Sequence, residues 1–272
     1  MQQVDVENII KSKNPKLLRV LPRWLINYIK KVVHQTEFNE FLVSTKDKYA
    51  HDFVKAAVEN FKVKVSSSGL ENIPKNEGCI IVCNHPLGGL DGIAVMHEIG
   101  KVRLDLKALV NDILMNLENV RSLLLAINKH GNNSISNLKL LEESFASNGC
   151  TIVFPAGMVS RKNDGVIYDL EWKKAFIAKA IKHKRKIIPV HVDAQNSNFF
   201  YNLALFRKKL GIKANIEMFY LVDEVYKQKG KSIHLTIGAP ISYEKFTKDN
   251  TEQYWAEYVK KEVYKLQKSK VS

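Results

Sequence analysis

The chain has few cysteines, and their spacing is not that of a disulfide framework or a metal site. Its 272 residues include only three, Cys79, Cys83 and Cys150, and each lies in a short apolar run. An odd number without metal-like spacing argues against a disulfide framework or a zinc site, and it fits a reducing cytoplasm. We therefore expect buried free thiols and no bound metal.

Long apolar runs are missing as well. No stretch reaches the roughly 20 apolar residues that a membrane-spanning helix needs. The first residues, MQQVDVE, lack the basic segment and apolar core of a signal peptide. The chain also has no internal repeat and no low-complexity tract. These absences predict a globular cytoplasmic protein of one large domain, with at most a small appendage.

Acidic residues are in the minority. Lysine and arginine number 42 against 28 acidic residues, which gives a net charge of +14. Such an excess suits an anionic partner, either nucleic acid or a membrane surface rich in acidic lipid. The lysines are scattered, without an arginine-rich block interleaved with aromatic residues, and this disfavours nucleic acid. A generally lysine-rich composition would produce the same excess on solvated faces.

Short apolar runs alternate with amphipathic segments from about residue 62 onward. The expected strands are 61–65, 79–83, 106–110, 123–127, 150–154, 186–192, 216–222 and 233–237. Helices are expected between most of them, and Pro189 suggests that its strand lies at an edge or carries a bulge. This alternation predicts an α/β fold with a mostly parallel central sheet flanked by helices.

The N-terminal region reads differently and predicts a helical subdomain. We expect three parts: amphipathic helices at 1–61, an α/β domain at 62–245, and a C-terminal helix at 246–272 packed on that domain. The helix after Pro22 places Trp24 and Tyr28 on a broad apolar side, opposite Arg23 and Lys30. Membrane-surface helices have this pattern, although a helix packed on the main domain has an apolar stripe too.

The stretch from Cys79 to Gly92 organises the chain. Its apolar first half predicts a buried strand, and the run then stops at Asn84-His85-Pro86 and a glycine pair. Asp91 follows at the start of a predicted helix. A histidine at this position can take a proton from a hydroxyl if a carboxylate holds its ring. The structural alternative is a hydrogen-bonded histidine beside a helix-capping aspartate.

Two further polar turns, at Asn128 and Pro155, also begin where predicted strands end. The carboxyl ends of parallel strands share one edge of the sheet, so the three turns can converge there and bind a ligand. The catalytic candidates are His85 and Asp91. The candidate substrate-binding residues are Asn84, Gly88, Gly89, Lys129, His130, Ala156, Gly157, Ser160 and Arg161.

These turns resemble motifs of the PlsC-type family of glycerophospholipid and lysophospholipid acyltransferases. The first family motif is Asn-His, four residues, then Asp, whereas five residues separate His85 from Asp91 here. Gly88 and Gly89 can absorb the extra residue as a bulge. Phe-Pro-Ala-Gly-Met-Val-Ser at 154–160 stands where the family carries Phe-Pro-Glu-Gly-Thr-Arg-Ser, and 188–190 is similar to its last block.

The resemblance implies an enzyme that esterifies a lipid hydroxyl with an acyl chain from acyl-CoA or acyl carrier protein, without a further cofactor. His85 would act as the general base and Asp91 would orient it. Backbone N–H groups of the 88–89 or 156–157 turns would hold the oxyanion. Cys83 adjoins these residues, but a cysteine in a buried strand is a poor nucleophile.

The acceptor is less sharply implied. The family's phosphate-binding arginine is replaced, since Met158 and Val159 stand in that part of the third motif. Arg161 and Lys129 could compensate. Residues 84–92 and 21–35 are also similar to a hemolysin-like branch of this family, which includes enzymes that O-acylate lyso-aminolipids. We expect a lysolipid acceptor of the glycine- or ornithine-lipid type, with lysophosphatidic acid as the alternative.

The expected partners follow from this reading. They are an anionic membrane surface, the lysolipid acceptor and, where it is the donor, acyl carrier protein; no nucleic acid is expected. The protein would sit peripherally on the inner face of the membrane. Two readings from other classes remain: a metal-dependent hydrolase that uses His85, Asp91, His191 and Asp193, and a non-enzymatic basic module that binds membranes.

Overall fold

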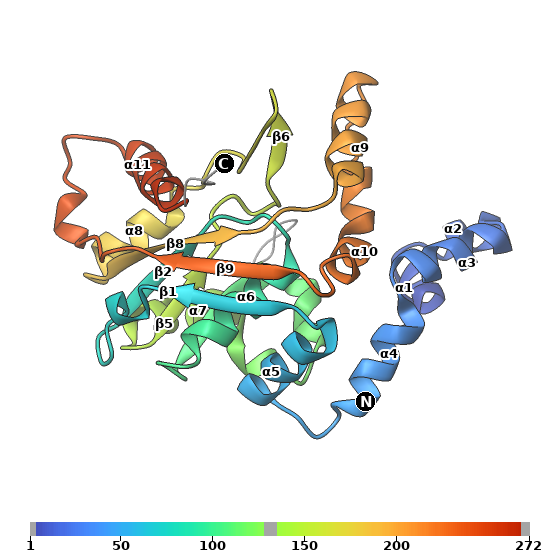
Figure 1. Ribbon diagram of the computed structural model, residues 1–272, viewed down its shortest axis with the longest axis horizontal. Coiled ribbons are helices and arrows are strands. Elements are labelled where there is room, and N and C mark those ends of the chain that lie inside the picture. Colours follow the sequence, from blue (N-terminus) through green and yellow to red (C-terminus); the bar gives the residue numbers. More distant parts are fainter. Residues whose placement is uncertain (1–3, 128–134, 268–272) are drawn as a thin grey trace. The chain divides into compact units, whose positions relative to one another are not determined.

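Two compact units make up the protein, whose computed structural model describes residues 4–127 and 135–267 (Figure 1). The first, which we call the helical unit, contains the described residues of Met1–Lys48 and Asn196–Lys229. The second, the sheet unit, contains those of Tyr49–Gln195 and Gly230–Ser272. Each unit is therefore built from two separate stretches of chain.

A seven-stranded sheet in the order β1-β9-β8-β2-β5-β3-β4 forms the centre of the sheet unit. All neighbouring strands are parallel except β8 and β9, which run antiparallel. This arrangement confirms the predicted mostly parallel α/β fold. The strands are β1 (Lys64–Ser68), β2 (Cys79–Cys83), β3 (Leu106–Asn111), β4 (Leu124–Ile127), β5 (Cys150–Val153), β8 (Lys186–Asp193) and β9 (Ser232–Ile237), with a separate hairpin of β6 (Arg161–Asn163) and β7 (Val166–Tyr168).

Helices cover this sheet. On one face, Ile80 and Val82 of β2 belong to a buried apolar cluster that also contains Trp172 and residues of α8 and α11. Elsewhere α5 packs against α6, which contacts β1 and β3. The helices of this unit are α5 (Ala50–Phe61), α6 (Gly89–Ile99), α7 (Ile135–Ala146), α8 (Ala175–Lys182) and α11 (Glu252–Lys265), with 3-10 turns η1 (Leu70–Asn72), η2 (Asp112–Asn116), η3 (Arg121–Leu123) and η5 (Tyr243–Lys245).

The three cysteines are buried and free, as predicted. Cys79 and Cys150 are register partners on β2 and β5, and their Sγ atoms lie 3.2 Å apart. Burial also raises the pKa of the Cys83 thiol well above its ordinary value. A buried thiol that stays protonated is a poor nucleophile, as predicted for Cys83.

The strand that contains Pro189 lies inside the sheet, so the predicted edge position is wrong. β8 has β9 on one side and β2 on the other. The predicted bulge is confirmed: Val190 pairs with Ile237, and Ile187 with Ile241, so three residues of the partner segment oppose two of β8. Pro189 occupies the interrupted part of the ladder, where its missing N–H costs no hydrogen bond.

The helical unit contains no strand among its described residues. Its elements are α1 (Val6–Lys13), α2 (Pro15–Val20), α3 (Arg23–Val32), α4 (Gln35–Ser44), α9 (Asn198–Lys209), the 3-10 turn η4 (Ile216–Tyr220) and α10 (Leu221–Tyr226). The predicted strand at 216–222 is therefore wrong. Glu217 and Glu224 are both fully buried. They are seven residues apart, a spacing that places both side chains on one face of a helix, and a short apolar run does not distinguish a strand from a buried helix.

The units also divide the chain differently from the predicted domains. α5 lies within the predicted N-terminal helical part but belongs to the sheet unit, because it packs on α6. The α10 region joins the N-terminal helices: Tyr28 and Tyr220, 192 residues apart, share a hydroxyl–hydroxyl hydrogen bond of 3.0 Å. The His34 ring stacks on Tyr226 at 3.9 Å. Such distant contacts leave no local trace in a sequence.

The predicted apolar side of α3 is only partly covered. Ile26 and Val32 are buried, whereas Trp24 is 69% exposed and Tyr28 43% exposed. No helix within the described ranges has the length and apolar character needed to cross a bilayer.

Candidate active site

His85 and Asp91 form a hydrogen-bonded pair at the carboxyl end of β2. His85 Nδ1 and Asp91 Oδ2 lie 3.0 Å apart. The chain leaves β2 at Cys83 and enters α6 at Gly89, so both residues lie on the connection and its first helical turn. Gly88 has a φ of 85°, a conformation that glycine adopts without a steric penalty. This conformation agrees with the expectation that the glycine pair absorbs the extra residue of the PlsC-type motif.

Asp91 is the most deeply buried part of this pair. Its side chain is fully buried, and Oδ2 also accepts hydrogen bonds from the backbone N–H groups of Leu87 at 2.8 Å and Gly88 at 3.0 Å. Burial raises the pKa of Asp91, while the hydrogen bonds from His85 and the two backbone N–H groups act in the opposite direction. The carboxylate is therefore a fixed acceptor that determines how the imidazole ring is turned.

The backbone of His85 is held by the third turn. Its carbonyl oxygen accepts from the Ser160 N–H at 2.8 Å, and its N–H donates to Asp169 Oδ1 at 3.2 Å. The His85 ring also lies against that of Phe154, with centroids 4.5 Å apart. The first and third turns thus converge as predicted, and together they restrain both the ring and the backbone of His85.

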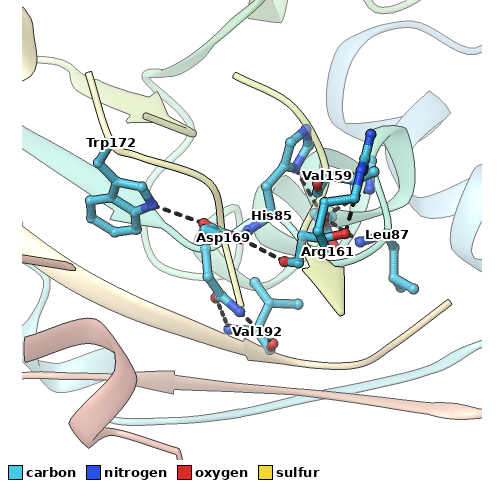
Figure 2. A network of polar contacts seen from close by, with 11 residues as sticks. His85, Leu87, Val159, Arg161, Asp169, Trp172 and Val192 are labelled. Atoms are coloured by element: carbon cyan, nitrogen blue, oxygen red, sulfur yellow. Dashed lines mark hydrogen bonds and ion pairs between the residues drawn. The ribbon is translucent and has the colours of Figure 1, made fainter. Parts of the chain in front are cut away.

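Asp169 is the centre of this arrangement, and sequence reasoning missed it. Figure 2 shows its carboxylate between Trp172 and the His85 turn. Oδ1 accepts from Ser160 Oγ at 2.5 Å, and Oδ2 accepts from Trp172 Nε1 at 2.9 Å. Trp172 is fully buried, so the carboxylate is anchored in the core. The only local signal is an acidic residue three positions before a tryptophan, which is too common to be informative.

The C-terminal helix α11 also contributes hydrogen bonds to the network around Asp169. Tyr264 of α11 accepts a hydrogen bond from the Asp169 N–H at 2.8 Å. Lys260 donates to the carbonyl oxygens of Asp169 at 3.0 Å and Leu170 at 3.1 Å. Burial lowers the pKa of Lys260 and raises that of Tyr264. The predicted C-terminal helix therefore contributes directly to the support of the site.

Several predicted substrate-binding residues have structural partners instead. Asn84 is buried, and its side-chain amide bonds both backbone polar groups of Val192, at 2.7 and 3.0 Å, which extends the β2–β8 pairing. Ser160 is 1% exposed and directed to Asp169. Ala156 is buried as well, and the Gly157 N–H closes a turn to Phe154 O. These contacts favour positioning roles over substrate contact.

The predicted cationic and turn residues have mixed outcomes. Arg161 is 8% exposed, and its Nη1 donates to Val159 O at 2.7 Å, so this part of the guanidinium is hydrogen-bonded to the backbone. Gly88 donates to Asp91, whereas Gly89 is the exposed first residue of α6. Lys129 and His130, with the rest of the second turn, lie outside the described residues.

The described residues provide no set of metal ligands for the alternative of a metal-dependent hydrolase. Within residues 4–127 and 135–267, no three histidine, cysteine or acidic side chains gather closely enough to hold a metal ion. His191 is buried, and its ring meets the edge of Tyr264 with centroids 5.6 Å apart. Burial lowers the pKa of His191, while Asp193 and Asp169 act against that shift. The lowered pKa favours the neutral form of His191, which packs in the protein core.

Comparisons with known proteins identify the family of this chain. A family model described as acyltransferase matches residues 8–272. Lyso-glycine lipid O-acyltransferases from Phocaeicola vulgatus and Bacteroides thetaiotaomicron are each 47% identical to this chain and cover 97% of it, over 95% and 97% of their own lengths. Both the predicted family resemblance and the predicted enzyme class, acyl transfer, are confirmed.

A solved structure shares the fold. The 1-acyl-sn-glycerophosphate (LPA) acyltransferase PlsC from Thermotoga maritima superimposes with a TM-score of 0.52 at 19% sequence identity. The match covers 97% of this chain and 93% of that chain. At 19% identity this similarity supports a shared fold and nothing further.

Proposed function

The chain belongs to the acyltransferase family, and we propose that it transfers an acyl group from an acyl thioester to the hydroxyl of a lyso-glycine lipid. The observation that carries the proposal is the His85–Asp91 pair, held at 3.0 Å at the carboxyl end of β2. The two lyso-glycine lipid O-acyltransferases, similar along nearly their whole length, support this choice of acceptor.

In the proposed mechanism His85 is the general base. With Nδ1–H directed to Asp91, the lone pair of the neutral ring is on Nε2, which takes the proton of the acceptor hydroxyl. The hydroxyl oxygen then bonds to the thioester carbonyl carbon and the C–S bond breaks. The thiolate leaves with the proton from Nε2, which restores the neutral imidazole. Asp91 offsets the positive charge that His85 carries in between.

The oxyanion of this step needs donors that are already in place. The Gly88 and Gly157 N–H groups have acceptors within the protein. We therefore assign the donor role to the backbone N–H of Gly89, which begins α6, where the helix dipole also favours negative charge. The acyl donor is an acyl-CoA or an acylated carrier protein, and both supply the same thioester.

The acceptor assignment agrees with the surroundings of the third turn. Val159 is 1% exposed and carries no charge, and Arg161 Nη1 is directed to a backbone carbonyl. A phosphate monoester carries up to two negative charges, whereas a lyso-glycine lipid carries one carboxylate. A site with few cations at this turn fits the second acceptor better than lysophosphatidic acid.

We propose further that the protein binds peripherally to the inner face of an anionic membrane. Among the described side chains of the N-terminal helices, Val20 and Trp24 are the most exposed large apolar ones. Arg19 and Arg23 adjoin them in the sequence. Arg19 and Val20 end α2, and Arg23 and Trp24 begin α3, so exposed apolar and basic residues flank the junction of two short helices, as is typical of membrane-surface attachment.

The deciding experiment offers purified protein two acceptors in parallel, a lyso-glycine lipid and lysophosphatidic acid, with labelled acyl-CoA and acylated carrier protein as donors. We expect transfer mainly to the lyso-glycine lipid. Equal or faster transfer to lysophosphatidic acid would contradict the acceptor. Loss of transfer in His85→Ala, but not in His97→Ala farther along α6, tests the base, since both variants remove an imidazole.

A further inference from the structure

The end of α9 and the loop that follows expose an unusual number of large apolar side chains. We call residues 205–216 the α9 tip, drawn in orange in Figure 1. Its exposed members are Leu205 at 42%, Phe206 at 60%, Leu210 at 57%, Ile212 at 39% and Ile216 at 40%. Single exposed apolar residues are ordinary, but a cluster of this kind marks an interaction surface.

The charge of the tip has one sign. No acidic residue occurs between Asn198 and Ile216, while Arg207, Lys208, Lys209 and Lys213 all lie there. Arg207 is neutralised by the fully buried carboxylate of Glu217, at 2.7 Å from its Nε. The three lysines are exposed, so they set the charge that the tip presents to a partner.

The tip has a defined conformation. α9 ends at Lys209, and Gly211 follows the C-cap Leu210 with a φ of 70°. The Gly211 N–H donates to Lys208 O, and the Ile212 N–H donates to Arg207 O, both at 3.1 Å. This is a Schellman ending. Arg207 also donates from Nη1 to Ile212 O at 2.7 Å while it holds Glu217. The apolar side chains are therefore displayed by a fixed loop, which lowers the entropy cost of docking.

We propose that the α9 tip inserts into the interfacial region of an anionic lipid bilayer. Phe206, Leu210 and Ile212 would enter the acyl-chain boundary, and the flanking lysines would contact lipid phosphates. This inference rests on the proposed lipid acceptor for its biological setting. It adds a second attachment surface, far along the chain from the N-terminal helices.

The chemistry of the tip favours a bilayer over an acidic protein. Between Leu205 and Ile216 the side chains are apolar, cationic or small, apart from Asn215, and none is a carboxylate or hydroxyl. Such a surface has hardly any side-chain acceptor for the donors that a protein partner would present. A bilayer presents acyl chains below and phosphate and ester oxygens above, all of which are acceptors, so it matches both components.

Sedimentation of the full-length protein with phosphatidylcholine vesicles, with and without phosphatidylglycerol, tests the proposal. Phe206→Ser with Leu210→Ser should weaken binding to both kinds of vesicle about tenfold or more. Leu138→Ser with Leu140→Ser, two exposed leucines of α7, is the matched control and should change nothing. Replacing Lys208, Lys209 and Lys213 by Gln should weaken binding to the anionic vesicles about 100-fold at low salt.

Activity separates this proposal from the proposed function. Each tip variant should acylate lysolipid presented in detergent micelles as fast as the unaltered protein does. Unchanged vesicle binding in both tip variants would overturn the proposal. If vesicle binding were unchanged but transfer from acylated carrier protein slowed, the tip would be a protein-docking surface instead. Absence of acyl transfer in a protein that still binds vesicles through the tip would contradict only the function.

Discussion

The sheet unit and the helical unit distribute polar and apolar side chains differently. The sheet unit buries the carboxylates of Asp91 and Asp169 and surrounds them with hydrogen-bond donors. The helical unit has fewer residues, yet it carries most of the large exposed apolar side chains that the structure describes, among them Trp24 and Phe206. Catalytic geometry must be over-determined by packing, whereas attachment to a fluid surface needs only exposed area and charge.

The largest expected effect breaks the chemistry and leaves attachment untouched. His85→Ala should lower the rate of acyl transfer by about 1,000-fold, because general-base catalysis typically contributes that much. Vesicle binding should remain unchanged, since His85 lies in the sheet unit. Radiolabelled transfer and vesicle sedimentation on the same preparation provide the two readings. A variant that keeps normal turnover would remove His85 from the mechanism.

Asp169→Asn should give the next largest effect. The carboxylate accepts from Ser160 and the His85 N–H on one oxygen and from Trp172 on the other. An amide has one oxygen, so one buried donor would lose its partner and the His85 turn would shift. We expect turnover to fall about 100-fold with a smaller change in KM, and the free energy of unfolding to drop by about 1–3 kcal/mol.

A control for this variant is available in the nearby hairpin. Asp164 is exposed in the turn between β6 and β7, so Asp164→Asn makes the same chemical change without removing a buried acceptor. Kinetics and denaturant unfolding of both variants should separate them clearly. If Asp169→Asn lowered stability but left kcat unchanged, Asp169 would support the fold without positioning His85.

A third change acts on the helical unit alone. Trp24→Ser removes a side chain that is 69% exposed, so the fold should tolerate it. Binding to anionic vesicles should weaken about tenfold, while turnover on micellar lysolipid should stay the same. Tyr254→Ser, an exposed aromatic residue of α11 in the sheet unit, is the comparison and should bind vesicles normally. Equal behaviour of the two variants would argue against attachment through α3.

The smallest expected effect concerns pH and the core behind the site. Burial lowers the pKa of His191, so below about pH 6.5 the unfolded chain gains a proton that the folded protein does not. Folding stability is then lost as the pH falls, by up to about 1.4 kcal/mol per pH unit, until the folded-state pKa is reached. His191→Phe keeps a ring against Tyr264 and removes this dependence.

Thermal unfolding at pH 5.5 and 7.5 measures the difference. The unaltered protein should lose more stability between these values than His191→Phe does. Equal losses would mean that His191 is protonated in the folded state as readily as in the unfolded chain. The result also bears on the comparison of the units, since it tests whether polar groups in the sheet unit are truly shielded from water.

Local patterns predicted the parts of the site that lie on one continuous stretch. The apolar run at 79–83, the glycine pair and Asp91 together specify strand, turn and helix, and this geometry brings Asp91 Oδ2 to His85 Nδ1. The convergence of the first and third turns was predictable because parallel strands end at one edge of a sheet. The second turn, at 128–134, lies outside the described residues.

Other features depended on contacts between distant residues. Asp169 became part of the site because Trp172, Ser160 and the α11 side chains all meet it, and no periodic pattern points to such a meeting. The residues from 216 to 222 looked like a strand, since short apolar runs have the same composition in strands and buried helices. In the structure these residues form helical turns, in which the buried Glu217 pairs with Arg207.

The sequence by itself determined the fold class, the pairing of His85 with Asp91 and the excess of positive charge, because these follow from local periodicity, composition and residues a few positions apart. The tertiary structure decided the rest. It placed Pro189 inside the sheet, turned Ser160 and Asn84 into supports of the His85 turn, and left the α9 tip exposed. The physical reason is that burial and hydrogen-bond partners are set by segments that meet only after the chain has folded.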